Sequence, residues 1–234
     1  MGKIVVITQS NYLPWRGYFD LLRSADEVVL LDSVQYTRQD WRNRNVIKGA
    51  RGLEWLTIPV KGRYPQAIDE TRIADGHWAK RHVRAIELAY RNAPCFAKMA
   101  PWLFGLLESV SLEPMLTRVN ERTLRAICDK LGIKAKLRRC NEIVERERLR
   151  TLGATERLVA LATAVGADRY LTAPAARAYL EADRFHAANI QVVWMSYEGY
   201  APYPQLWGGF ELRVSIVDLL LNTGPEASHY VAKS

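Results

Sequence analysis

Residues 9–48 read QSNYLPWRGYFDLLRSADEVVLLDSVQYTRQDWRNRNVIK, and this stretch decides the fold. The apolar run Ile4–Ile7 stands just before it and is long enough for one buried parallel strand. Glu27–Leu31 predicts a second buried strand, after a short helix over about 18–24. Asp32 follows that strand directly. Open α/β sheets bind ligands beyond the carboxyl ends of their strands, so we expect Asp32 to lie at a ligand site.

The polar and aromatic residues of the same stretch form a candidate binding set. Arginine presents planar donors suited to phosphate or carboxylate, Asn and Gln fix orientation by hydrogen bonds, and aromatic rings stack on ligand rings. A solvated connector with ordinary stacking and capping residues is the alternative interpretation. The residues that we expect to bind substrate here are Gln9, Asn11, Trp15, Gly17, Gln35, Tyr36, Arg42, Arg44, Asn45 and Lys48.

Two later helices add polar residues to apolar faces. The helix expected over 116–131 carries Asn120 on its apolar stripe, where a buried amide needs either a ligand or a backbone partner. The last helix, within 214–222, places Ser215, Asp218 and Asn222 on one stripe, and Ser215 suits a helix start. We expect Asp32 to act as a general base and Asp218 as a second carboxylate. Asn120, Ser215 and Asn222 complete the expected substrate-binding set.

Strand–helix alternation returns after Gly132. Strands are expected near 133–137, 169–172 and 190–195, and small residues at 172–176 would let backbone N–H groups approach an anion. These signals predict an α/β, Rossmann-like fold with a mostly parallel sheet and helices on both faces. We expect one domain over 1–234, with an α/β core at about 1–75 and 132–234 and a helical insert subdomain at about 76–131. In the insert, helices are expected over 78–91 and 102–110, with Pro94 and Pro101 as breakers, and a mobile loop over 62–68 precedes it.

Charge and composition indicate which classes of partner and which cellular location to expect. The net charge is +8, and residues 118–150 alone hold eleven basic and five acidic side chains. This favours acidic partners such as nucleotide phosphates, although a solvated surface would look the same. Three cysteines without disulfide or metal spacing, and no run long enough to span a bilayer, favour a reduced, cytoplasmic protein without a membrane span. No motif identifies a cofactor, and no metal-ligand cluster is visible.

Several motifs together resemble one family. QSNYLPWRGYFD, DSVQYTRQDWRNRN and WLTIPV, with the later YPQL and VSIVDLLLNTG, are similar to the WbqC-like proteins over nearly the whole chain. The common form of the first motif has Pro where this chain has Ser10. Many genes of that family lie in surface-polysaccharide and O-antigen clusters. The resemblance therefore implies a pathway, while it leaves the reaction open.

A second resemblance concerns the loop after the first strand. Residues 13–18 resemble the HxGH loop of nucleotidyltransferase-type Rossmann folds, with Trp15 and Tyr18 at the two histidine positions. Because both histidines are missing, this likeness supports the fold and argues against adenylyl transfer.

Three functions remain open at this level. The first is a transferase that modifies an activated amino sugar, for example by acyl or aminoacyl transfer, with a nucleotide or nucleotide-sugar as its phosphate-bearing substrate. The second is an adenylate-forming or aminoacyl-tRNA-using enzyme, for which the basic segment makes tRNA a possible partner. The third is a non-catalytic scaffold of a polysaccharide assembly.

Overall fold

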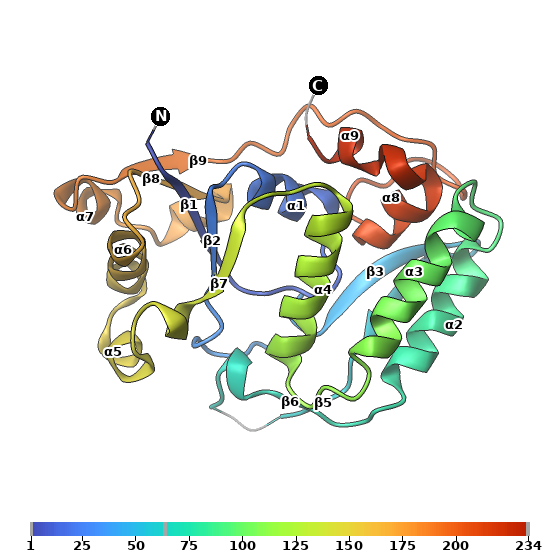
Figure 1. Ribbon diagram of the computed structural model, residues 1–234, viewed down its shortest axis with the longest axis horizontal. Coiled ribbons are helices and arrows are strands. Elements are labelled where there is room, and N and C mark those ends of the chain that lie inside the picture. The colour runs from blue at the N-terminus through green and yellow to red at the C-terminus, as the bar shows by residue number, and fades with distance from the viewer. Residues whose placement is uncertain (1, 63–64, 233–234) are drawn as a thin grey trace.

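A five-stranded parallel sheet forms the centre of the computed structural model, which describes residues 2–62 and 65–232 (Figure 1). The strand order is β7-β2-β1-β8-β9. The strands are β1 (Ile4–Thr8), β2 (Glu27–Leu30), β7 (Lys136–Arg139), β8 (Arg169–Thr172) and β9 (Gln191–Trp194). Every pair is parallel, which confirms the Rossmann-like α/β class predicted from the sequence.

Alternate residues of each strand belong to different hydrophobic cores. Val5 and Ile7 of β1 pack in one core, and Val6 packs in the other. The first core is covered by α5 (Arg146–Thr151), α6 (Ala154–Ala164) and α7 (Ala182–Ala187). The second is covered by α1 (Arg16–Arg23) and α4 (Leu116–Lys130), on the other side of the sheet in Figure 1. Helices on both faces explain why the central strand β1 is a nearly continuous apolar run.

The helices of the expected insert belong to the second core. They are α2 (Trp78–Tyr90), α3 (Phe96–Ser109) and α4, and they share one hydrophobic cluster with the C-terminal α8 (Ile216–Thr223) and α9 (Ala227–Val231). Pro101 lies inside α3 rather than ending a helix before it. Pro101 is the sixth residue of α3, so the Ala97 carbonyl loses its helical donor, and α3 continues because its apolar face is packed in the second core. Our expectation of a break at Pro101 was therefore wrong.

Two antiparallel hairpins complete the strands. β3 (Arg44–Gly49) pairs with β4 (Gly52–Thr57), and β5 (Val60–Lys61) pairs with β6 (Arg72–Ile73). The sequence had suggested a ligand-binding connector where β3 lies, because its Arg, Asn and Lys masked the strand. The loop expected over 62–68 includes positions 63 and 64, which lie outside the described residues.

The remaining elements are short 3-10 turns. They are η1 (Ile68–Glu70), η2 (Cys140–Glu142), η3 (Pro174–Ala178) and η4 (Gly224–Glu226). Gly132, at φ +70°, follows the end of α4, as expected for a helix terminated by glycine. Within the residues described, no helix combines the length and the apolar character needed to cross a bilayer.

Candidate functional site

A cavity of about 270 Å³ opens at the carboxyl ends of β1 and β8. From β1 the chain continues to β2 on one side, and from β8 it continues to β9 on the other. The two strands therefore flank the topological switch point of the sheet, where open α/β folds bind ligands. We call this space the switch-point cavity. Its volume lies near the lower end of the range of about 300–1,000 Å³ for small-molecule sites.

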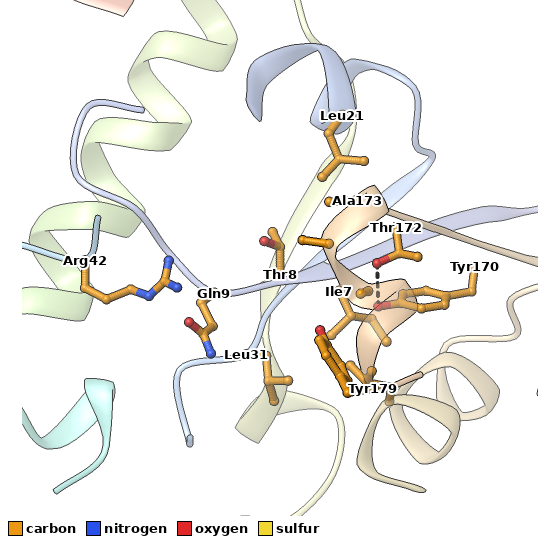
Figure 2. Close-up of a pocket in the computed structure, with 13 residues that line it drawn as sticks. Ile7, Thr8, Gln9, Leu21, Leu31, Arg42, Tyr170, Thr172, Ala173 and Tyr179 are labelled. Carbon is orange, nitrogen blue, oxygen red and sulfur yellow. Dashed lines mark hydrogen bonds between the residues drawn. The ribbon is translucent and has the colours of Figure 1, made fainter. Parts of the chain in front are cut away.

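Polar groups stand at both ends of the switch-point cavity. Gln9 and Arg42 lie at one end, and Thr172 and Tyr179 lie at the other, as Figure 2 shows. The walls between them are mainly apolar and come from α1, α6, η3 and the strand ends. The apolar lining residues are Ile7, Leu21, Leu31, Leu158, Ala173, Ala175 and Ala176. This arrangement suits an elongated ligand with an anionic group near Arg42 and a less polar part along the walls.

Arg42 is held from three directions. Its guanidinium donates to Asn11 Oδ1 and lies 3.5 Å from an Asp40 carboxylate oxygen. Its main-chain carbonyl accepts a hydrogen bond of 2.9 Å from Asn120 Nδ2. Asn11 and Asn120 thus position Arg42 beside Gln9, and the structure brings these four predicted residues together. Asn120 also donates to Ser10 Oγ at 3.2 Å.

Asp32 lies beneath this edge of the sheet. Its carboxylate accepts hydrogen bonds from Ser10 N at 2.8 Å, from Ser10 Oγ at 2.6 Å and from Thr117 Oγ1. Burial raises the pKa of Asp32, while the Ser10 and Thr117 hydrogen bonds and Arg42 oppose that rise. The three donors occupy most of the acceptor sites of the carboxylate, which has about four. The contacts support a positioning role, and the predicted general-base role stays a prediction.

Asp218 belongs to a different and deeply buried network. Its two oxygens accept hydrogen bonds from Tyr90 at 2.9 Å and Tyr203 at 2.8 Å. Lys48 Nζ donates to Gln205 Oε1 at 2.8 Å, and Gln205 Nε2 donates to the Tyr203 hydroxyl at 3.1 Å. Burial raises the pKa of Asp218, and the two tyrosines and Lys48 oppose the rise. Among the described residues, no hydrogen-bond partner is common to Asp218 and Asp32.

Three further predicted residues satisfy main-chain groups. Ser215 Oγ donates to the Leu13 carbonyl at 2.7 Å and accepts from Val217 N, so it caps α8 as expected. Asn45 Nδ2 donates to the Tyr12 carbonyl at 3.1 Å, and Asn222 Nδ2 donates to the Asp218 carbonyl at 2.8 Å. The Ser215 contact fixes the loop after β1 against α8, the Asn45 contact fixes it against β3, and the Asn222 contact lies within α8. None of the three side chains lines the switch-point cavity.

Trp15 and Gly17 form a packing unit at the start of α1. The Trp15 ring lies edge-on to Tyr197, with centroids 5.2 Å apart. A Cβ at Gly17 would stand 2.4 Å from that indole, so only glycine fits beneath it. At the second position of the HxGH-like loop, the Tyr18 hydroxyl donates to the Gln9 carbonyl at 2.9 Å. Both aromatic residues thus support the loop rather than line the cavity.

The last three predicted residues lie away from the cavity lining. Gln35 is exposed and donates to the Tyr36 carbonyl at 3.0 Å. Tyr36 packs in the hydrophobic core. Arg44 lies over the Trp55 ring at 4.1 Å from its centroid, on the outer side of the β3–β4 hairpin.

Sequence reasoning missed part of the cavity. Thr8 and Tyr170 line it, as does Tyr179 from the loop after η3. Thr8 could have been found, because it is the last residue of an expected strand. Tyr179 has no such signal, since a lone exposed tyrosine after a short helix carries no periodic pattern. Within residues 2–62 and 65–232, no group of three His, Cys, Asp or Glu is placed to hold a metal ion.

Comparison with known proteins identifies the family that the sequence motifs resemble. The model of the WbqC-like protein family matches residues 9–230. The chain belongs to the WbqC-like family. A relative in Mycobacterium tuberculosis, named there as the uncharacterized protein Rv1507c, is 47% identical over 232 residues, which cover 98% of this chain and 97% of the relative. No solved structure was found to match this WbqC-like protein.

Proposed function

We propose that this WbqC-like protein is a cytoplasmic transferase that binds a nucleotide or nucleotide-sugar in the switch-point cavity and modifies the activated sugar. The single observation that carries the proposal is the position of Gln9 and Arg42 in a cavity at the switch point of a parallel sheet. Membership of the WbqC-like family favours a sugar of surface polysaccharide as the substrate.

The lining suggests how such a ligand would lie. The Arg42 guanidinium offers a charged donor for a phosphate, and the Gln9 amide offers both a donor and an acceptor. Main-chain N–H groups at the turn after β8, around Ala173, can approach an anion because the side chains there are small. The apolar walls and the Tyr179 ring would face the base or sugar. Acyl or aminoacyl transfer to an amino sugar is the reaction that we propose.

An adenylate-forming enzyme is the second candidate. The strand order and the cavity at the switch point favour a nucleotide equally well. The positions of the HxGH-like loop are filled by Trp15, which packs on Tyr197, and Tyr18, which donates to Gln9. Neither can replace a histidine that binds phosphate, so this candidate needs other groups for its chemistry.

A ligand screen by thermal shift tests the proposal. The panel holds ATP, nucleotide-sugars, coenzyme A, S-adenosylmethionine and tRNA. A ligand at 100 times its dissociation constant stabilises a protein by about 2.7 kcal/mol. We expect nucleotide-sugars to raise the melting temperature of the wild-type protein. Arg42→Ala should lower the affinity for them by about ten- to a hundredfold, because a charged hydrogen bond contributes about 1.5–3 kcal/mol. A shift with ATP and not with nucleotide-sugars would favour the second candidate.

Arg44→Ala is the matched control. Arg44 belongs to the same segment and carries the same charge, but its guanidinium lies on Trp55. Binding that is lost equally in both variants would reflect general charge and would contradict the assigned site. If no ligand of the panel binds the wild-type protein, the transferase proposal fails and the scaffold function gains weight.

A further inference from the structure

A second cavity, of about 190 Å³, opens at the carboxyl ends of β2 and β7. We call it the β2–β7 cavity. It lies on the other side of residues 30–32 from the switch-point cavity, since Leu31 lines one cavity while Leu30 and Asp32 line the other. Its volume is below that of most drug-sized sites, which points to a small ligand or one group of a larger ligand.

Three arginines from three elements line the β2–β7 cavity. Arg118 comes from the first turn of α4, Arg139 from the end of β7 and Arg146 from the start of α5. All three lie within residues 118–146, and the fold brings the three elements together at this cavity. A converging set of guanidinium groups is the arrangement that proteins use for phosphate.

Carboxylates hold these arginines in place at the rim. Arg118 pairs with Glu121 at 3.1 Å, and Arg146 pairs with Asp69 at 2.7 Å. Arg139 lies between Glu121, at 3.7 Å, and Glu142. Each pair uses part of a guanidinium, which has five N–H donors. The remaining donors can therefore bind an anion without breaking the pair, and the pair fixes the side chain in advance.

The other charges near the cavity leave it receptive to an anion. The Asp32 carboxylate is already occupied by Ser10 and Thr117. α4 begins at this cavity with no acidic residue of its own in the first turn, so the positive end of its dipole lies beside the cavity, where Asp32 contacts Thr117. Burial raises the pKa of Asp69 to about 6, and Arg146 only partly offsets that rise.

We propose that the β2–β7 cavity binds the phosphate group of a small phosphorylated molecule through Arg118, Arg139 and Arg146. This binding does not depend on the function proposed for the switch-point cavity. The role that follows from it does rest on that function: the β2–β7 cavity would hold the second substrate of the transferase, one strand away from the first.

Titration calorimetry with inorganic phosphate, sulfate and glucosamine 6-phosphate tests the proposal on the full chain, with unphosphorylated glucosamine as the negative ligand. Arg118→Ala is the main variant, because its side chain is 42% exposed and the protein should fold without it. We expect Arg118→Ala to weaken phosphate and sulfate binding by about tenfold or more. The matched control is Arg122→Ala, one turn along α4, whose guanidinium donates to the Ser109 carbonyl outside the cavity.

A pH series adds a second readout. Asp69 faces Arg146 and Arg150 of α5, Asp32 after β2 and its neighbour Glu70. Below pH 6 the neutral Asp69 no longer places a negative charge in the cavity lining, so sulfate, which keeps its charge, should bind more tightly at pH 5 than at pH 7. Asp69→Asn should remove that difference.

Failure of this proposal is distinct from failure of the proposed function. If the wild-type protein binds none of inorganic phosphate, sulfate and glucosamine 6-phosphate, or if Arg118→Ala binds them as tightly as the wild-type protein, the β2–β7 assignment alone is overturned. Phosphate binding that is lost in Arg42→Ala and kept in Arg118→Ala would also overturn it, because the anion would then occupy the switch-point cavity. Tight binding of glucosamine 6-phosphate but not of inorganic phosphate, with the loss in Arg118→Ala, would confirm the site and show that the sugar contributes.

Discussion

Asp32 and Asp218 look alike in the sequence and differ in their surroundings. Each is a carboxylate that accepts hydrogen bonds from hydroxyl groups, and burial raises the pKa of each. Asp32 lines a cavity at the carboxyl end of the sheet, next to Ser10 and the loop that carries Gln9. Asp218 lies in a sealed network with Tyr90 and Tyr203 in the second core.

The comparison teaches that polar density alone does not mark a binding site. Around Asp218, the polar side chains bind each other and hold α8, β3 and the loop of residues 200–211 together. Around Asp32, the same chemistry fixes groups that border open space. The Asp218 network should therefore control stability, and the Asp32 network should control both stability and ligand binding.

The largest effect is expected from Asp218→Ala. The change leaves the Tyr90 and Tyr203 hydroxyls without an acceptor and removes the negative charge near the buried Lys48. Breaking a buried charged network in this way costs about 3–5 kcal/mol. Urea unfolding measures the cost, and the exposed Asp129→Ala is the control, expected within about 0.5 kcal/mol of wild type. Unchanged stability with lost ligand binding would show that Asp218 belongs to a binding site.

A pH-dependent loss of stability is expected from His82 in the same core. Its Nε2 donates to the Thr57 carbonyl and its Nδ1 accepts from the Tyr12 hydroxyl at 2.9 Å, which requires the neutral ring. Burial lowers the pKa of His82 to about 4. Between about pH 6.5 and pH 4 the unfolded chain binds the extra proton, so stability should fall by up to about 3 kcal/mol as the pH falls.

His82→Gln tests that expectation, because glutamine keeps hydrogen-bonding groups and does not titrate. The variant should be less stable than the wild type at pH 7, and the difference should shrink toward pH 4. A constant difference across this range would mean that His82 does not control the acid response.

A smaller effect on stability, with an effect on binding, is expected from Asp32→Asn. The amide cannot accept from all three donors of Ser10 and Thr117, which costs about 1–3 kcal/mol. Because Ser10 adjoins Gln9 and Thr117 adjoins Arg118, affinity should fall in both cavities. Calorimetry with a nucleotide-sugar and with sulfate measures the two losses. Asp218→Asn is the comparison, and equal binding losses in the two variants would remove the distinction between the networks.

Much of the fold could be predicted from sequence because burial on both faces leaves a strong signal. The run at 4–7, the strand at 169–172 and the helix at 116–131 all lie where the apolar pattern placed them. The strand β3 could not be found this way, because Arg44, Asn45 and Lys48 interrupt its apolar pattern.

The candidate site was predictable only in part. Gln9 and Arg42 were found because they stand out chemically near a strand end. The division of the polar residues into a cavity lining and a sealed network depends on contacts between residues such as Lys48 and Gln205, which lie 157 positions apart. Local patterns hold no information on pairs of that kind.

The three hydrogen bonds of Asp32 have a consequence for how the two cavities communicate. One oxygen of the Asp32 carboxylate accepts hydrogen bonds from both the Ser10 hydroxyl and the Thr117 hydroxyl. Ser10 adjoins Gln9 of the switch-point cavity, and Thr117 adjoins Arg118 of the β2–β7 cavity. A ligand that moves the start of α4 must therefore also move the end of β1. Whatever factor the first ligand applies to the affinity of the second, the second applies to the first, so the coupling between the two cavities would run through one carboxylate.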